Sequence, residues 1–256
     1  MPLITYITVC KNAAKTIGNT IRSVSSLPFE DYEYIIIDGG STDGTVSLLR
    51  QFEPMFAGKL KWMSESDKGI YDAMNKGIRM STGTWVNFLN DGDMALMVPA
   101  GVLQSVEVGG YDVIAFSVSS EQGVLKSDVG MTLRFRNTLQ HQGVFYRRKA
   151  LFSVGGYNTS YKILGDHDLN LRLLRGGVGI LVKDDVVAYH SLGGISCVGG
   201  DALRKEMRKV VFENYGVLML CVAFFEHKLF GLRQWCARWS CFRSVFARDG
   251  MGTCGP

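Results

Sequence analysis

The chain has 256 residues, of which 46% are hydrophobic and 20% are charged, so it can bury a sizeable core and general disorder is excluded. Its net charge of +4 is too small to indicate a nucleic-acid-binding protein. Residues 1–200 hold 19 basic and 19 acidic side chains, whereas residues 201–256 hold 9 and 5. The whole positive excess therefore lies in the C-terminal segment.

We expect neither a signal peptide at the start of the sequence nor a membrane-spanning segment within it. The N-terminal stretch MPLITYITVCKNAAK has no basic segment ahead of an apolar one, so we expect no signal peptide. The longest strongly apolar run, Val217 to Phe225, is far shorter than the roughly 20 residues that cross a bilayer. The six cysteines form no CxxC pair and indicate reduced thiols. We therefore expect a cytoplasmic protein.

Four short apolar runs open the chain and predict buried strands, at 4–9, 33–38, 60–65 and 84–89. Apolar residues at helical spacing lie between these runs and predict helices at 13–27, 45–52 and 70–80. Alternation of this kind indicates an α/β fold, with a parallel sheet and helices on both of its faces. Ligands of such sheets bind at the edge where the parallel strands end.

The second half of the chain is less regular. Its apolar runs predict four further strands, at 112–118, 142–148, 179–183 and 186–191. Helical spacing predicts a helix from Asp168 to Arg175. Since no linker interrupts residues 1–200, we predict one α/β domain over 1–200, followed by a separate helical tail over 201–256.

Two aspartates follow the second predicted strand. Asp38 closes an apolar run and is expected to be exposed to the crevice at the sheet edge, where it could accept hydrogen bonds from a ribose or a base. Asp43 precedes the helix that starts near Thr45, and we interpret it as a cap or turn residue. The glycines around them do not form GxGxxG, so a dinucleotide site has little support.

The fourth predicted strand ends in Asn90-Asp91-Gly92-Asp93. Two carboxylates separated by one glycine can converge on a divalent cation, because Mg²⁺ and Mn²⁺ prefer oxygen ligands. An ordinary Asn-Asp-Gly turn is the alternative, and an isolated motif of this kind does not decide between them.

A third polar constellation begins at Gly165. Asp166 sits at a predicted helix N-terminus, where it is either a cap or a general base held rigidly at the site. Asp168 is expected to pair with Arg172 one helical turn on, and His167 to be a surface or hydrogen-bonding residue. The segment 140–143 precedes a strand and either lines the site or forms an ordinary loop.

These motifs, taken together and in order, resemble those of the family 2 glycosyltransferases, which are inverting enzymes with a GT-A fold. The resemblance covers residues 3–200 and rests on the following segments: ITVCKN, IIIDGGSTDGT, SESDKGIYDAMNKGI, TWVNFLNDGD, HQGVFYRRKALFSVGGY and GDHDLNLRL. It implies a nucleotide-diphospho-sugar transferase fold, with a Rossmann-like mixed sheet flanked by helices. The bacterial branch that makes colanic acid and O-antigen is the most similar.

The resemblance also implies roles for individual residues. Asp38 would contact the base and ribose of the donor, and Asp67 and Lys68 would lie beside the nucleotide. The full set of implied nucleotide-binding residues is Thr8, Val9, Asn12, Asp38, Asp67, Lys68 and Asp91.

Metal and catalytic roles follow from the same resemblance. Asp91 and Asp93 would form the metal-binding pair for Mn²⁺ or Mg²⁺, with Asp93 as the direct ligand, and Asp166 would be the catalytic base. Many relatives carry an acidic residue where this chain has Gly165. His190 lies where some enzymes of this fold bind the metal, although a histidine that simply ends a strand is the alternative.

The tail has its own pattern. Within 228–246, one helical face carries aromatic and aliphatic side chains and arginines flank it, which is typical of a helix lying in a membrane interface. The residues of this stripe are Leu232, Trp235, Trp239, Phe242 and Phe246. The alternative is a helix packed on the catalytic domain or on a second subunit. The membrane interpretation predicts a peripheral protein at the inner face of the cytoplasmic membrane.

The resulting prediction is an enzyme of the EC 2.4 class. It would transfer a sugar from a nucleoside-diphosphate sugar to a hydroxyl of a saccharide or lipid-linked saccharide, in the biosynthesis of a bacterial surface polysaccharide. A nucleotidyltransferase is one alternative, but the stretch CKNAAKT lacks the Gly-rich, basic loop that would grip a triphosphate. A non-catalytic module that binds sugar nucleotides is the other, and it would be expected to lack the paired aspartates or the base.

Overall fold

The computed structural model describes residues 1–105, 109–191 and 200–216. The chain divides into two compact units, Met1–Val210 and Val211–Pro256. Of the second unit, residues 211–216 are described and they are helical. The aromatic stripe predicted within 228–246 lies outside the described residues. No helix in the described part of the chain is long and apolar enough to cross a membrane.

The first unit is built on one nine-stranded sheet, in the order β3-β2-β1-β4-β8-β6-β9-β5, with β7 paired to β6. The parallel half contains β1 (Ile4–Cys10), β2 (Tyr32–Asp38), β3 (Leu60–Ser64) and β4 (Trp85–Phe88). Its crossover helices are α1 (Ile17–Ser25), α2 (Thr45–Phe52) and α3 (Ile70–Met80), with the short 3₁₀ turn η1 (Glu53–Phe56) after α2. The alternating strands and helices predicted for the first half of the chain are therefore confirmed.

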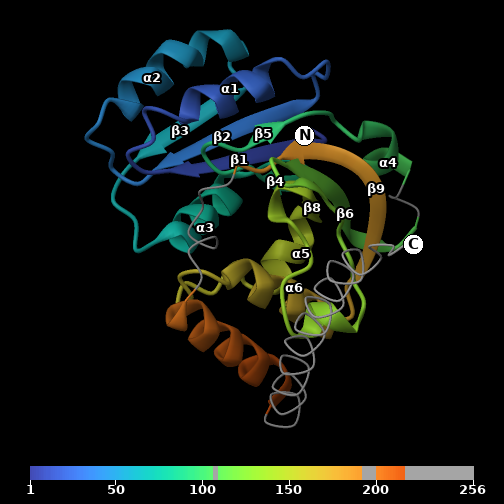
Figure 1. The fold of residues 1–256 in the computed structure, drawn as a ribbon. Coiled ribbons are helices and arrows are strands. Elements are labelled where there is room, and N and C mark those ends of the chain that lie inside the picture. The colour runs from blue at the N-terminus through green and yellow to red at the C-terminus, as the bar shows by residue number, and fades with distance from the viewer. Residues whose placement is uncertain (106–108, 192–199, 217–256) are drawn as a thin grey trace, which may run out of the picture. The chain divides into compact units, whose positions relative to one another are not determined.

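Helices cover both faces of this half, with α1 and α2 on one side and α3 on the other (Figure 1). Tyr6 and Tyr34 pack in one core cluster with Ile21 of α1. Ile7 faces the other way, where its side chain lies against Gly77 of α3. The side chains alternate between faces because successive residues of a strand point in opposite directions. Both faces are apolar, which explains why these strands read as unbroken hydrophobic runs.

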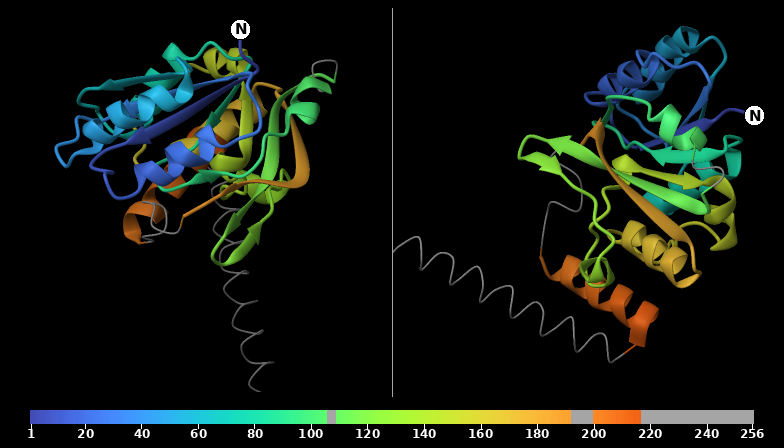
Figure 2. Two further views of the ribbon diagram at one scale, coloured as in Figure 1. Left: turned by 90° about the horizontal axis from the view of Figure 1, so that it is seen from above. Right: turned by 90° about the vertical axis from the view of Figure 1, so that its right-hand side faces the viewer.

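The other half of the sheet is mixed. β8 (Val144–Arg147) runs antiparallel to both β4 and β6, so it joins the two halves. β6 (Tyr111–Ser120) pairs in parallel with β9 (Gly179–Tyr189), and the two strands run side by side in both views of Figure 2. The remaining elements are β5 (Met94–Ala95), β7 (Gly123–Leu125), α4 (Ala100–Ser105), α5 (Arg148–Ser153), α6 (Gly165–Arg175), η3 (Met131–Arg134) and η4 (His141–Gly143).

Two differences between the predicted and the observed boundaries concern the candidate site. The strands expected at 179–183 and 186–191 are one strand, β9, whose irregular register against β6 accommodates the polar residues in its middle. The strand ends at Tyr189, so His190 follows it. Helix α6 begins at Gly165, three residues before the predicted start at Asp168. Both changes move polar residues of the predicted site to the ends of elements.

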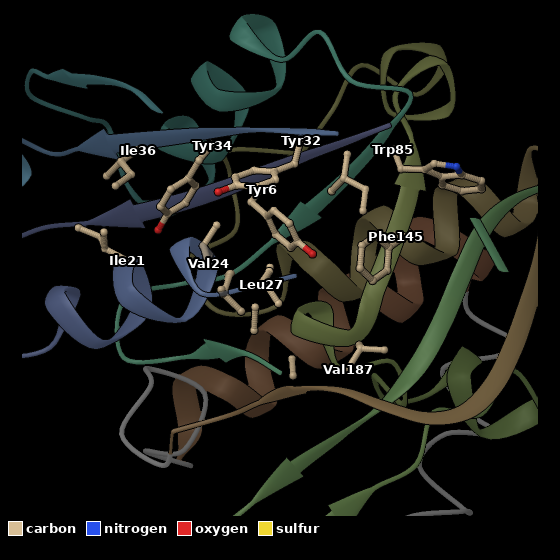
Figure 3. Packing of buried hydrophobic residues seen from close by; sticks show 14 of the residues in the cluster. Tyr6, Ile21, Val24, Leu27, Tyr32, Tyr34, Ile36, Trp85, Phe145 and Val187 are labelled. Carbon is tan, nitrogen blue, oxygen red and sulfur yellow. The ribbon is translucent and has the colours of Figure 1, made fainter. Parts of the chain in front are cut away.

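A single hydrophobic cluster spans the two halves. Figure 3 shows Tyr6 and Tyr34 from the parallel half in the same cluster as Phe145 of β8 and Val187 of β9. Tyr6 and Phe145 meet edge to face, with ring centroids 6.5 Å apart. The mixed half is thus part of the same core as the parallel half, which fixes the strand ends of the two halves relative to each other.

Candidate active site

Asp38 lies at the carboxyl end of β2 but has no exposed surface. Its carboxylate accepts hydrogen bonds from the Ser41 backbone N–H at 2.9 Å, from the Ser41 hydroxyl, and from the Ser64 hydroxyl at 2.6 Å. Burial alone would raise the pKa of Asp38, but these hydrogen bonds outweigh it and lower that pKa. The expectation that this carboxylate is exposed is wrong, because the turn after β2 folds back over it.

Three predicted nucleotide contacts lie at the carboxyl end of β1. Thr8 is buried, and its hydroxyl donates to the Leu89 carbonyl at 2.6 Å; Val9 is buried as well. Asn12 is exposed and has a positive φ of 53°. Its side-chain carbonyl accepts from the Thr42 backbone N–H at 3.0 Å, which ties the loop after β1 to the loop after β2. Asn12 is thus the one of the three whose side chain reaches the surface.

Asp43 also connects the loops after β1 and β2, and it has the contacts of a turn residue. Its carboxylate accepts from the backbone N–H of Thr45 at 3.1 Å, at the start of α2, and from the backbone N–H of Ala14 at 3.0 Å. These bonds satisfy donors in two loops at once. The interpretation of Asp43 as structural agrees with this geometry.

Asp67 lies close to the loop that follows Asp38. A Cβ atom at Gly39 would lie 2.9 Å from the Asp67 carboxylate, so glycine is needed at that contact. Asp67 pairs with Lys76 of α3, which also pairs with Glu65 at 2.8 Å. Lys68 is exposed, so its ammonium is available to an anion near the ends of β2 and β3.

The loop after β4 carries Asp91. Its carboxylate accepts a hydrogen bond from the Thr16 hydroxyl at 2.9 Å. Burial, and after it the charge of Asp93, raises the pKa of Asp91. Removing solvent from two neighbouring carboxylates is unfavourable unless a cation lies nearby.

Asp93 is 3% exposed and lies at the centre of a polar cluster. Its carboxylate is 3.1 Å from Nδ1 of His190, accepts from the Ser191 backbone N–H at 3.0 Å, and lies 2.9 Å from the side-chain amide of Gln142. β5 pairs with β9, and this pairing brings Asp93 and His190 together across 97 positions of sequence. Spacing along the chain carries no sign of this contact.

Asp166 occupies the first turn of α6. Its carboxylate accepts a hydrogen bond from the Asn137 amide at 2.7 Å and lies 4.0 Å from Nδ1 of His141. The other nitrogen of His141 is 3.0 Å from the amide of Asn90. A chain of polar side chains therefore connects Asp166 to the loop that holds Asp91 and Asp93.

Gly165 is explained by its surroundings. A Cβ atom at this position would lie 2.7 Å from the ring of Tyr71. That ring cannot move aside easily, because its hydroxyl donates to the Ile163 carbonyl at 2.7 Å and its face stacks on Tyr157. The acidic residue that many relatives carry here would not fit beside Tyr71. Gly165 is the first residue of α6 and Asp166 the second.

The two neighbours of Asp166 have structural contacts. Asp168 pairs with Arg172 at 2.7 Å, as predicted. His167 is fully buried, not at the surface, and its Nε2 lies 2.7 Å from the Leu133 carbonyl. Burial lowers the pKa of His167, and it is accordingly neutral near pH 7.

The predicted site residues fall into two groups. In the first, Asp93 contacts His190 directly, and His141 and Asn90 connect Asp166 to the loop of Asp91 and Asp93. In the second, Asp38 and Asp67 lie at the ends of β2 and β3. The residues His141 and Gln142 link the parts, although the sequence marked the segment 140–143 only as lining the site or as a loop. The sequence assigned no role to Asn90 or Asn137, because short polar residues in loops have many roles.

The oxygen and nitrogen atoms around Asp93 are of the kinds that bind a divalent cation. Carboxylate oxygens and an imidazole nitrogen are suitable ligands for Mn²⁺. Gln142 adds a buried side-chain carbonyl that has no hydrogen-bond partner within the described ranges. Among the residues described, no three His, Cys, Asp or Glu side chains form a metal-binding group.

The comparisons with known proteins define the class. Residues 5–163 match the family model described as Glycosyl transferase family 2. The chain is a glycosyltransferase, and it belongs to this family. The PGL/p-HBAD biosynthesis glycosyltransferase of Mycobacterium bovis (strain BCG / Pasteur 1173P2) is 30% identical to it over 205 residues, which cover 76% of this chain and 79% of the relative.

Solved structures give the fold. The S. aureus TarS fragment 1–349, in complex with UDP-GlcNAc, superposes with a TM-score of 0.67 at 16% identity, over 82% of this chain and 65% of the fragment. The mannosyltransferase PcManGT from Pyrobaculum calidifontis, in complex with GDP-Man and Mn²⁺, has a TM-score of 0.62 at 15% identity, over 95% and 84%. In the larger TarS structure the chain spans 39% of the length. The predicted GT-A fold is confirmed.

Proposed function

We propose that this glycosyltransferase moves a sugar from a nucleoside-diphosphate sugar to a hydroxyl group of a saccharide acceptor, with inversion at the anomeric carbon. The observation that carries the proposal is the connected site, in which Asp166 at the start of α6 faces the loop of Asp91 and Asp93 through His141 and Asn90. A base and a group of carboxylates that can hold a cation are the two parts that such a transfer needs.

Donor binding is assigned to the ends of β1, β2 and β3. This edge carries Asn12, Lys68 and the turn over Asp38, and the carboxylate of Asp67 lies against Gly39 of that turn. Asp38 keeps the turn in place through Ser41 and Ser64, so its role toward a base or ribose would require these hydroxyls to shift or to relay the contact. The UDP-GlcNAc and GDP-Man complexes of the two solved structures support a nucleotide-sugar donor.

The chemistry follows from the positions of the charged groups. The acceptor hydroxyl attacks the anomeric carbon while Asp166 takes its proton, and the bond to the nucleoside diphosphate breaks on the opposite face. Asn137 holds the Asp166 carboxylate in a fixed orientation at 2.7 Å. Asp93, with Asp91 beside it, would hold Mn²⁺ or Mg²⁺, and a bound cation would supply charge neutralisation to the departing diphosphate.

Turnover of nucleotide sugars tests the proposal directly. The full chain would be incubated with UDP-, GDP-, dTDP- and CMP-sugars and Mn²⁺, and release of the free nucleotide and the thermal shift would be measured. Slow release of one nucleoside diphosphate, with a rise in melting temperature, is expected. In a parallel incubation with a nucleoside triphosphate and a sugar 1-phosphate, release of pyrophosphate would indicate the nucleotidyltransferase instead. Binding without any turnover would indicate the non-catalytic module.

The acceptor and the location are part of the same proposal. We assign a lipid-linked saccharide of a surface polysaccharide as the acceptor, and the inner face of the cytoplasmic membrane as the place of action. The positive excess in 201–256 and the aromatic stripe within 228–246 support this assignment. Deleting residues 217–256 is expected to abolish binding to anionic liposomes; unchanged binding would contradict the membrane role and leave the transfer reaction in place.

A further inference from the structure

Gln142 is a buried amide in the centre of the proposed metal site. It is 1% exposed and belongs to η4, the short turn before β8. The side chain of Asn87 holds this turn by donating to the Gln142 and Val144 carbonyls, both at 3.0 Å. At Gly143 a Cβ atom would lie 2.7 Å from the Phe116 carbonyl, so the turn packs directly on β6. The backbone of the turn is thus held on two sides, and this fixes the position from which the Gln142 side chain extends.

Three side chains converge beside this turn. The Gln142 amide nitrogen lies 2.9 Å from Asp93 Oδ2 and 2.7 Å from His190 Nδ1, and His190 Nδ1 lies 3.1 Å from Asp93 Oδ1. Adjacent ligands in an octahedral shell with bonds of about 2.1 Å are separated by about 3 Å. The three groups thus have the mutual spacing of ligands that share one ion.

With Asp93 as a carboxylate anion, protein atoms alone cannot satisfy all three contacts. If Nδ1 of His190 carries a proton, it donates to Asp93 but faces an N–H of Gln142. If Nδ1 carries a lone pair, it accepts from Gln142 but faces an oxygen of Asp93. One of the contacts is repulsive in either case. A cation between the three side chains would attract the lone pairs of both Asp93 and His190, and the repulsion between them would be offset.

The side-chain carbonyl of Gln142 completes this arrangement. Its Oε1 is buried and has no hydrogen-bond partner in the described part of the chain. A half-turn of the terminal amide exchanges oxygen for nitrogen at nearly the same positions, and it directs Oε1 toward Asp93 and His190. An amide oxygen is a suitable ligand for Mn²⁺ or Mg²⁺. Asp91 is held by Thr16 and contributes charge from farther out.

We infer that Gln142 is the third protein ligand of the divalent cation, through its side-chain oxygen, beside Asp93 and His190. This inference rests on the proposed function, since it concerns the cation that the transfer reaction would use. It assigns to the segment 140–143 a role that differs from that of a lining loop. It also explains how the site can hold a cation with fewer than three acidic or imidazole ligands.

Binding of MnCl₂ to the metal-free full chain, with and without UDP, tests the inference. The signal of free Mn²⁺ in electron paramagnetic resonance gives the dissociation constant, and the melting temperature is measured in parallel. Gln142→Leu is expected to weaken Mn²⁺ binding about 10-fold to 100-fold. Gln142→Glu is expected to bind Mn²⁺ at least as tightly as the wild type. Gln104→Glu, on the exposed side of α4, is the matched control and should change nothing.

Gln142→Glu separates a ligand from a hydrogen-bond donor. If residue 142 is a metal ligand, the Gln142→Glu variant should have a lower melting temperature than the wild type without metal, because a carboxylate is placed next to Asp93. Adding Mn²⁺ should then raise its melting temperature more than that of the wild type. If Gln142 only donates a hydrogen bond to Asp93, the Gln142→Glu variant should bind Mn²⁺ more weakly than the wild type. That result would overturn the inference. Should Gln142→Leu fail to fold, the glutamate variant still decides.

The same samples distinguish this inference from the proposed function. Nucleotide-sugar turnover by the wild type that persists in EDTA would leave the transfer reaction standing and overturn the metal ligand. Absence of Mn²⁺ binding in the wild type, with UDP present, would also overturn it. Tight Mn²⁺ binding that depends on Gln142, without turnover of any donor, would support the ligand and contradict the proposed reaction.

Discussion

Single side chains in this protein act through the groups that orient them. Asp166 is 19% exposed, and the Asn137 amide and His141 limit the orientations of its carboxylate. Asp166 is also in the first turn of α6, so the helix fixes the direction in which its side chain leaves the backbone. A catalytic base requires this kind of fixed orientation toward the group whose proton it accepts.

Asp166→Asn tests that role. The amide has nearly the same shape and can still contact the neighbouring side chains, but it cannot accept a proton from the acceptor. We expect turnover to fall by about 10²-fold to 10⁴-fold while the affinity for the nucleotide is unchanged. Transfer rates and calorimetric titration with the nucleoside diphosphate would be measured. Asp184→Asn, at an exposed position of β9, is the control, and full activity of the Asp166→Asn variant would refute the assignment.

Whole elements position the base. The backbone N–H groups of Lys162, Ile163 and Leu164, which directly precede α6, all donate to the carboxylate of Glu206, at 2.8, 2.9 and 3.0 Å. Glu206 lies in the helical residues 201–210 of the first unit. The start of α6 is therefore anchored by a segment that follows the sheet in sequence.

Removing this anchor should loosen the start of α6. Glu206→Ala leaves three N–H groups without their acceptor, and we expect a loss of about 1–3 kcal/mol in the free energy of unfolding. Turnover should fall more than nucleotide binding, because Asp166 is displaced while the ends of β1–β3 are not. Lys205→Ala, an exposed neighbour, is the control. Equal effects of the two substitutions in denaturation and kinetic measurements would argue against the anchor.

The packing of α6 on α3 gives a second element-scale prediction. Gly165→Ala adds a methyl group 2.7 Å from the Tyr71 ring, and overpacking of this kind costs about 1–3 kcal/mol. The helix start should shift and turnover should fall with stability. Gly101→Ala is the matched control, since nothing lies within 4 Å of its Cβ and alanine favours the helix. Urea denaturation of both variants gives the comparison, and a neutral Gly165→Ala would contradict the packing.

At the scale of the whole first unit, Glu33 joins several parts of the sheet. It is 5% exposed, and its carboxylate accepts from the hydroxyl of Thr5 at 2.7 Å, from the backbone N–H of Gly83 at 3.1 Å, and from Lys61 at 3.0 Å. It also accepts from the backbone N–H of Thr82 at 2.5 Å. Glu33 therefore connects β1, β2, β3 and the turn before β4.

These contacts make stability depend on pH. Burial would raise the pKa of Glu33, but the hydrogen bonds from Thr5, Thr82 and Lys61 outweigh burial and lower it. A carboxyl whose pKa is lower in the folded state stabilises the fold above its unfolded pKa of about 4.3, and this stabilisation is lost as the pH falls through the folded pKa.

Glu33→Gln should therefore cost about 1–3 kcal/mol of unfolding free energy at pH 7, because the charged acceptor is lost. The difference from the wild type should shrink as the pH falls below about 4, where Glu33 itself becomes protonated. Denaturant titrations at pH 7 and near pH 3.5 provide the measurement. A difference that is the same at both pH values would show that the charge of Glu33 is not the stabilising feature.

Local pattern was sufficient for much of this first unit. Apolar runs such as that ending in Asp38 predicted the strands, and the residues between them predicted α1, α2 and α3, because alternation of burial follows directly from the order of residues. The pairing of Asp168 with Arg172 was predictable for the same reason, since both lie on one helix. The motifs of Asp91, Asp93 and Asp166 were likewise visible, because each is contiguous.

Contacts between distant segments could not be predicted from local pattern. The burial of Asp38 depends on a turn folding back over it, and the meeting of Asp93 with His190 depends on β5 pairing with β9. The order of residues determined the strands, the helices and the short acidic motifs of this glycosyltransferase, because those features are set by neighbours along the chain. Only the tertiary structure decided which side chains contact one another in the site, since Gln142, His190 and Asp93 meet through sheet pairings that no local pattern encodes.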